Sequence, residues 1–216
     1  MASIIVGISG GSGAPYALRL LDVLLQSERQ VKAILSPAAE KILALECDVH
    51  LEGSPLEKQA QLRNALPIDK TEVGLELYDH RDLAAPISSG SFPSSAMVIV
   101  PCSMGALGRI AAGVSSDLIS RAADVTLKER RKLIVVPRET PLGEIHLRNM
   151  LAVTRAGAVV LPAMPGFYHR PQHVSDMVDM IVSRILDQLG IDNHIFKRWK
   201  GEGVSKFLSV DEDAGA

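Results

Sequence analysis

The stretch Gly7-Ile8-Ser9-Gly10-Gly11-Ser12-Gly13-Ala14-Pro15 follows the apolar run Ser3–Ile8 and opens a helix-length segment, residues 14–27. A Val/Ile-rich run, a glycine turn and a helix start together predict the first βα unit of a parallel sheet. Pro15 suits the first helical turn, where a missing N–H does no harm. Glycine amides can approach an anion closely and a helix start carries partial positive charge, so the loop is predicted to bind phosphate.

Four more short apolar runs alternate with helix-length segments along the chain. The runs are residues 31–35, 96–100, 133–136 and 158–161, and the helical segments are residues 37–46, 117–129, 144–156 and 175–189. This alternation predicts an α/β fold, a flavodoxin-like (Rossmann-like) doubly wound parallel sheet in three αβα layers. Residues 49–92 contain three prolines and are expected to leave the sheet as an excursion with short elements. We expect one domain, residues 1–200, and a partly disordered C-terminal tail, residues 201–216.

Composition excludes several classes of protein. The 216 residues carry a formal net charge of -2, which argues against a nucleic-acid binder that needs a basic face. No apolar run approaches the roughly 18 residues of a membrane span, and the N-terminus lacks the basic region of a secretory signal. Cys47 and Cys102 form no CxxC pair, so we expect two reduced thiols in a cytoplasmic protein.

The glycine loop favours a mononucleotide over a dinucleotide. No register gives G-x-G-x-x-G, and the second strand ends at Ser36, where a dinucleotide fold would place an acid for the ribose. The loop also lacks the Gly-Lys-Ser/Thr of a Walker motif. FMN therefore fits better than NAD or ATP, although a tight turn without any ligand remains an alternative.

Other strand ends carry polar residues that point to the same edge of the sheet. Ser103 opens a turn of small residues after the third run, as a second wall of the site or simply as a helix cap. Arg138 and Glu139 follow the fourth run, in a functional site or a solvated loop. The segment 167–171 adds aromatic surface, as a ligand contact or a packed lid. The basic residues Arg130, Arg131 and Lys132 are interpreted as a solvated helix end.

No metal site is predicted. His169 and His173 are four residues apart, but Pro171 between them disfavours the regular helix that would bring both onto one face.

The order of these motifs resembles the flavin prenyltransferase family, the UbiX/Pad1-type proteins. The resemblance extends over residues 3–199. It rests on six motifs: Gly7-Ile8-Ser9-Gly10-Gly11-Ser12-Gly13-Ala14, Ser88-Ser89-Gly90-Ser91, Pro101-Cys102-Ser103, residues 121–131, Pro137-Arg138-Glu139-Thr140-Pro141 and Phe167-Tyr168-His169-Arg170-Pro171-Gln172. It implies a homododecameric, metal-free transferase that joins a dimethylallyl group from dimethylallyl monophosphate to reduced FMN. The prenylated FMN would serve a separate UbiD-type decarboxylase.

The resemblance also implies roles for individual residues. FMN is expected to contact Gly10, Gly11, Ser12, Ser36, Ser103, Met104, Gly105, Ala106 and Arg138. The prenyl phosphate is expected near Lys128, Glu139, Tyr168 and Arg184, with Ser89 and Arg121 contributed by a neighbouring subunit. The catalytic set is expected to be Glu139, Lys128, Ser12 and Glu46. Two positions depart from the family pattern: Gly11 replaces the usual Ala, and Ala106 replaces a Thr hydroxyl found in many relatives.

Two other functions remain open at this stage. An FMN-dependent cysteine-type decarboxylase of the same fold would use a His near the start of the second helix, yet no His lies in residues 1–49. A flavin-binding carrier is usually strongly acidic and rich in aromatics, whereas this chain has 4% aromatic residues.

Overall fold

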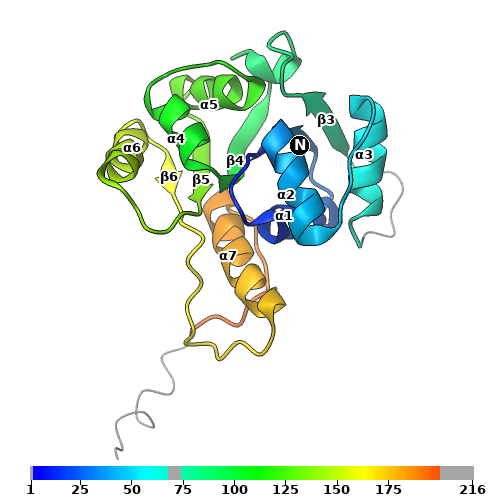
Figure 1. Cartoon of the computed structure of the whole chain (residues 1–216), viewed down its shortest axis with the longest axis vertical. Helices are drawn as coiled ribbons and strands as arrows, with labels where there is room; N and C mark the ends of the chain where they lie inside the picture. The colour runs from blue at the N-terminus through cyan, green and yellow to red at the C-terminus, as the bar shows by residue number, and fades with distance from the viewer. Residues whose placement is uncertain (1, 68–73, 200–216) are drawn as a thin grey trace, which may run out of the picture.

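All strands in the described part of the computed structural model, residues 2–67 and 74–199, form one parallel sheet in the order β3-β2-β1-β4-β5-β6 (Figure 1). The strands are β1 Ser3–Ile8, β2 Val31–Leu35, β3 Leu75–Asp79, β4 Ser94–Cys102, β5 Lys132–Pro137 and β6 Val159–Val160. The helices are α1 Ala14–Gln26, α2 Pro37–Cys47, α3 Pro55–Asn64, α4 Met104–Ala111, α5 Leu118–Lys128, α6 Glu144–Arg155 and α7 Val174–Leu189, with a short 3-10 turn at Pro86–Ser88.

Helices cover both faces of the sheet, as the alternation of elements predicted. Along β1, Ile4, Val6 and Ile8 pack into one apolar core with α1, α2, α3 and α7. Ile5 points the other way, into a second core with α4, α5 and α6. Successive strand residues face opposite sides, so an uninterrupted apolar run suits a strand covered on both faces. The predicted three-layer αβα class is confirmed.

The prediction that residues 49–92 leave the sheet is wrong in one respect, because this segment contains an edge strand, β3. In β3, Leu75 and Leu77 are buried while Glu76 between them is exposed. This alternation is typical of a half-buried edge strand, whereas the prediction relied on continuous apolar runs. Without β3 the order is that of a five-stranded flavodoxin-like sheet, and β3 extends it beside β2.

The chain direction places the two ends of α5 at opposite edges of the sheet. The Leu118 amide at the start of α5 donates to the carbonyl of His80, just beyond the carboxyl end of β3. The end of α5 lies at the amino edge, because β5 begins four residues after Lys128. Residues after β1, β2, β4 and β5 therefore meet at the carboxyl edge, with the switch point between β1 and β4.

The predicted tail, residues 201–216, lies outside the described residues. Within residues 2–67 and 74–199, no helix is long and apolar enough to cross a membrane.

Candidate functional site

Ser9 joins the loops that follow β1 and β4. Its hydroxyl donates to the Pro101 carbonyl at 2.9 Å and accepts from the Ser103 amide at 2.7 Å. The Ser9 side chain is buried, so these bonds are shielded from water. The two strand ends that flank the switch point are therefore held in a fixed relation to each other.

The structure explains the glycines of the first loop in different ways. A Cβ on Gly10 would lie 2.4 Å from the Cβ of Ala38, so only glycine allows the start of α2 to pack against the loop. A Cβ on Gly11 would meet its nearest neighbours at 3.5 Å, an ordinary contact. Gly13 has a φ of 130°, which side chains rarely adopt.

Glu46 occupies the start of α1, where phosphate was expected. Its Oε2 accepts hydrogen bonds from the amides of Gly13 at 2.9 Å and Ala14 at 2.8 Å. The Ser12 hydroxyl also hydrogen-bonds Glu46, and the Arg138 Nε donates to the Ser12 carbonyl at 3.1 Å. The last residue but one of α2 thus caps α1 and is linked through Ser12 to the loop after β5.

This environment holds Glu46 in its ionised form. Burial, the largest single influence, would raise the pKa of Glu46, but the hydrogen bonds from Ser12, Gly13 and Ala14 and the charge of Arg138 together lower it. Glu46 is therefore a fixed negative charge beside the loop, and the Ser12 hydroxyl can donate to it.

A cavity of about 700 Å³ opens beside this network, at the carboxyl ends of β1, β2 and β4. One wall contains Ser9, Gly10, Ser36 and Ser103. Ser36 caps α2 by accepting from the Ala39 amide, and Ser103 caps α4 by accepting from the Ala106 amide. Two helix N-termini therefore face one cavity, which gives an anion a site distinct from the occupied start of α1.

The lining of this cavity also includes residues that the sequence analysis missed. They are His80, Arg81, Arg109 and Asp117. Arg109 pairs with Asp117 at 3.1 Å, and its Nη1 lies 3.9 Å from the position of a Cβ on Gly105. Its long side chain thus reaches back over the first turn of α4. Only recognition of α4 as a helix would have indicated this cation.

Three more predicted FMN contacts directly follow Ser103, which lines this cavity. Met104, Gly105 and Ala106 form the first turn of α4. Ala106 is buried in the core beneath that turn, and its backbone amide, rather than its side chain, is bonded to Ser103. Glu139 follows Arg138 at the end of β5 and is half-buried, with one carboxylate oxygen accepting from the Thr140 amide.

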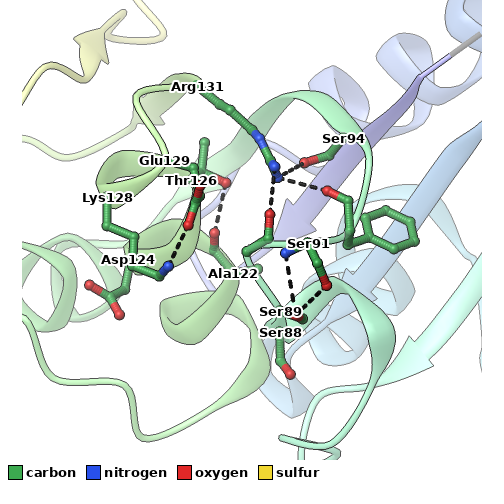
Figure 2. Close-up of polar contacts among 12 residues, drawn as sticks. Ser88, Ser89, Ser91, Ser94, Ala122, Asp124, Thr126, Lys128, Glu129 and Arg131 are labelled. Atoms are coloured by element: carbon green, nitrogen blue, oxygen red, sulfur yellow. Dashed lines mark hydrogen bonds and ion pairs between the residues drawn. The ribbon is translucent and has the colours of Figure 1, made fainter.

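Ser89, Arg121 and Lys128 form a second group around the serine loop, residues 88–94, which leads into β4. Figure 2 shows Ser89 and Lys128 in this group. The Arg121 Nε donates to the Ser88 carbonyl at 3.2 Å, which joins α5 to the serine loop. The Lys128 ammonium pairs with Glu129 and lies 2.9 Å from the position of a Cβ on Gly90. The structure therefore groups Lys128 with the two residues expected from a neighbouring subunit.

Lys128 and Glu139 lie at opposite edges of the sheet. β5 separates them, and its six residues span about 20 Å. A lysine side chain cannot cover that distance, so the two residues of one chain cannot contact the same small phosphate.

Tyr168 and Arg184 form a third group, in a cavity of about 620 Å³ between β6, α7 and the segment beyond α7. The ring of Tyr168 packs edge-on against Trp199, with centroids 5.7 Å apart. Arg184 pairs with Asp187 at 2.8 Å, and Asp187 also binds Arg198. Burial would raise the pKa of Asp187, but these arginines and a hydrogen bond from Asn193 lower it.

Among residues 2–67 and 74–199, no group of three or more His, Cys, Asp or Glu side chains is placed to hold a metal ion.

Comparisons with known proteins show which family the chain is similar to. A family model described as Flavoprotein matches residues 1–186. The flavin prenyltransferase UbiX of Pseudomonas aeruginosa is 48% identical over 196 residues, 91% of this chain and 93% of the relative. The crystal structure of AnUbiX in complex with FMN and dimethylallyl pyrophosphate is 40% identical, with a TM-score of 0.83 over 94% of this chain and 99% of that one. A dodecameric FMN-dependent UbiX-like decarboxylase from Escherichia coli O157:H7 is 38% identical, with a TM-score of 0.80 over 92% of this chain and 100% of that one.

Proposed function

Because the chain belongs to the flavoprotein family and, within it, to the flavin prenyltransferases of the UbiX type, we propose that it prenylates reduced FMN. In this reaction the bond between the dimethylallyl carbon and phosphate breaks, and carbon bonds form to N5 and C6 of the flavin. The product, prenylated FMN, would be the cofactor of a UbiD-type decarboxylase. The observation that carries the proposal is the Ser12, Glu46 and Arg138 network at the switch point.

The residues at the carboxyl edge fit FMN. A cavity of about 700 Å³ lies within the usual range for small-ligand sites, and it is bounded by Gly10, Ser36 and Ser103. We assign the phosphate of FMN to the facing N-termini of α2 and α4, because Glu46 already takes the amides at the start of α1. Gly11 and Ser12 would then contact the flavin together with Arg138.

The acceptor nitrogen must lose a proton when it is alkylated. The Ser12 hydroxyl is bonded to the Glu46 carboxylate, so Ser12 can take a proton from the flavin nitrogen while it passes its own hydroxyl proton to Glu46. The lowered pKa of Glu46 keeps this carboxylate available as an acceptor at neutral pH.

The leaving phosphate needs cations, and we assign two of them to a different chain. Lys128 cannot reach Glu139 within one subunit, so we propose that Lys128, Ser89 and Arg121 enter the site from a neighbouring copy. The pairing with Glu129 uses one of the three N–H donors of Lys128 and leaves two for phosphate. The dodecameric relative supports an assembly in which such sites form between subunits.

Tyr168 and Arg184, which form the third group, complete the proposed phosphate site. A phenol donor and a guanidinium beside aromatic rings suit a phosphate joined to an apolar allylic group. Closure at C6 requires proton transfers to and from carbon, which we assign to Glu139 and the released phosphate.

The decisive experiment is anaerobic incubation of the purified protein with reduced FMN and dimethylallyl monophosphate, followed by mass analysis of the flavin. We expect a product heavier by one prenyl unit. Recovery of unmodified FMN, with Pseudomonas aeruginosa UbiX active under the same conditions, would overturn the proposal.

A further inference from the structure

The chain reverses direction at the end of α5. Arg130 has a φ of 56°, its amide donates to the Leu127 carbonyl at 3.0 Å, and the Arg131 amide donates to the Thr126 carbonyl at 2.9 Å. These two bonds and the left-handed residue form a Schellman motif. The reversal places Arg131 beside the serine loop instead of continuing along the helix axis.

Arg131 then binds the serine loop through three acceptors (Figure 2). Its Nη2 donates to the Gly90 carbonyl at 2.6 Å, and its Nη1 donates to the Phe92 carbonyl at 2.8 Å and the Ser94 hydroxyl at 3.2 Å. The interpretation of Arg131 as part of a solvated helix end is therefore wrong. Local sequence could not show it, since the acceptors lie 37 to 41 positions earlier in the chain.

The loop held by Arg131 is the one that faces Lys128. The carbonyl of Gly90 is bound by Arg131, while a Cβ on the same residue would lie 2.3 Å from Glu129 Oε1 and 2.9 Å from Lys128 Nζ. The backbone of Gly90 is thus enclosed between the guanidinium and the Lys128–Glu129 pair. Next to it, the Ser89 hydroxyl lies 2.9 Å from the Ser91 hydroxyl and accepts from the Ser91 amide.

We propose that Arg131 is a positioning residue for prenyl transfer, which sets Ser89 and Lys128 at the spacing that the leaving phosphate requires. This inference rests on the proposed function. Three of the five N–H donors of Arg131 bind the loop, and we assign Arg131 no contact with the phosphate. A planar guanidinium can bind several carbonyls in fixed directions, whereas a lysine ammonium is a single flexible point charge.

The test compares Arg131→Gln and Arg131→Lys with the matched control Arg130→Gln. The control removes the same charge from the neighbouring residue, whose side chain is exposed. Steady-state kinetics with dimethylallyl monophosphate as the varied substrate give KM and kcat. FMN affinity, melting temperature and assembly size are measured on the same samples.

We expect Arg131→Gln to raise KM about tenfold or more, with a smaller change in kcat, and Arg131→Lys to give an intermediate KM. FMN affinity should match the wild type, because Arg131 bonds Gly90, Phe92 and Ser94, none of which is assigned to FMN. A KM equal to that of Arg130→Gln would overturn the inference. Parallel losses of FMN binding or of assembly in both Arg131 variants would also overturn it, by showing a global structural role. A wild-type protein that forms no prenylated flavin would instead overturn the proposed function.

Discussion

The Glu46 carboxylate lies 2.8 Å from the backbone nitrogen of Ala14, so the C-terminal end of α2 caps the N-terminus of α1. Gly13, at the cap position, has no side chain to do so. A negative charge at a helix N-terminus is stabilising, and here the same charge is bonded to Ser12 in the glycine loop. Folding of the first βα unit and preparation of the site therefore depend on one carboxylate.

Substitution Glu46→Gln should make the stability of the protein less dependent on pH. The folded-state pKa of Glu46 is lowered, so its contribution is complete above the unfolded-state pKa of about 4.3 and is lost as pH falls through the folded-state value. The side chain is largely exposed, so we expect a difference of about 1 kcal/mol at pH 7. Urea unfolding from pH 3 to pH 8 measures it, and a pH-independent difference would contradict the assignment.

Gly11 allows steric and electrostatic effects to be separated at one position. Gly11→Ala should retain FMN binding, because its Cβ meets only ordinary contacts at 3.5 Å. Gly11→Asp should weaken FMN binding more than about tenfold, since it places a carboxylate beside Ser103, at a helix N-terminus assigned to the phosphate. Fluorescence titration with FMN measures both variants. Equal affinity of the Asp and Ala variants would remove Gly11 from the FMN site.

Mixing two inactive variants tests whether Lys128 acts between subunits. Lys128→Gln and Glu139→Gln should each be impaired, but co-assembled chains should regain activity at interfaces that pair an intact Glu139 with an intact Lys128 of the next copy. Random mixing in equal amounts should restore roughly a quarter of the sites.

The control for this experiment mixes Glu46→Gln with Glu139→Gln. Each proposed site takes both of these carboxylates from one chain, at the carboxyl edge of its sheet. No activity should return in that mixture. Equal recovery in both mixtures, or none in either, would contradict the separation of Lys128 from Glu139.

Glu139→Gln should separate the early and late steps of the reaction. It keeps the size and hydrogen bonding of the side chain but cannot exchange a proton. In a single turnover, phosphate release should proceed near the wild-type rate. The absorption of the closed product should develop more slowly by about a hundredfold or more. If closed product forms at the wild-type rate, the released phosphate alone acts as base.

Chelation should leave turnover unchanged. The second and third groups provide Lys128, Arg121 and Arg184 for phosphate, and each charge-assisted hydrogen bond from such a cation contributes about 1.5 to 3 kcal/mol. The rate of flavin prenylation with and without EDTA tests this. A loss of activity that added Mg²⁺ restores would refute leaving-group stabilisation by these cations alone.

Most of the fold was predictable because it depends on local patterns. Continuous Val/Ile runs mark strands buried on both faces, and the glycine loop before Pro15 marks the entry to α1. Two elements were missed for physical reasons. The edge strand β3 is buried on alternate residues only, and α4 has eight residues, too few for a clear helical period.

The sequence by itself determined the fold class, the entry of the glycine loop into α1 and, through its motifs, the family membership that the comparisons confirm. Only the tertiary structure decided that Glu46 caps α1, that Arg131 binds the loop at Gly90, and that Lys128 lies a strand's length from Glu139. These relations join residues separated by many positions along the chain. They follow from strand order and helix direction, which bring distant residues together and keep near ones apart, and no local pattern contains that information.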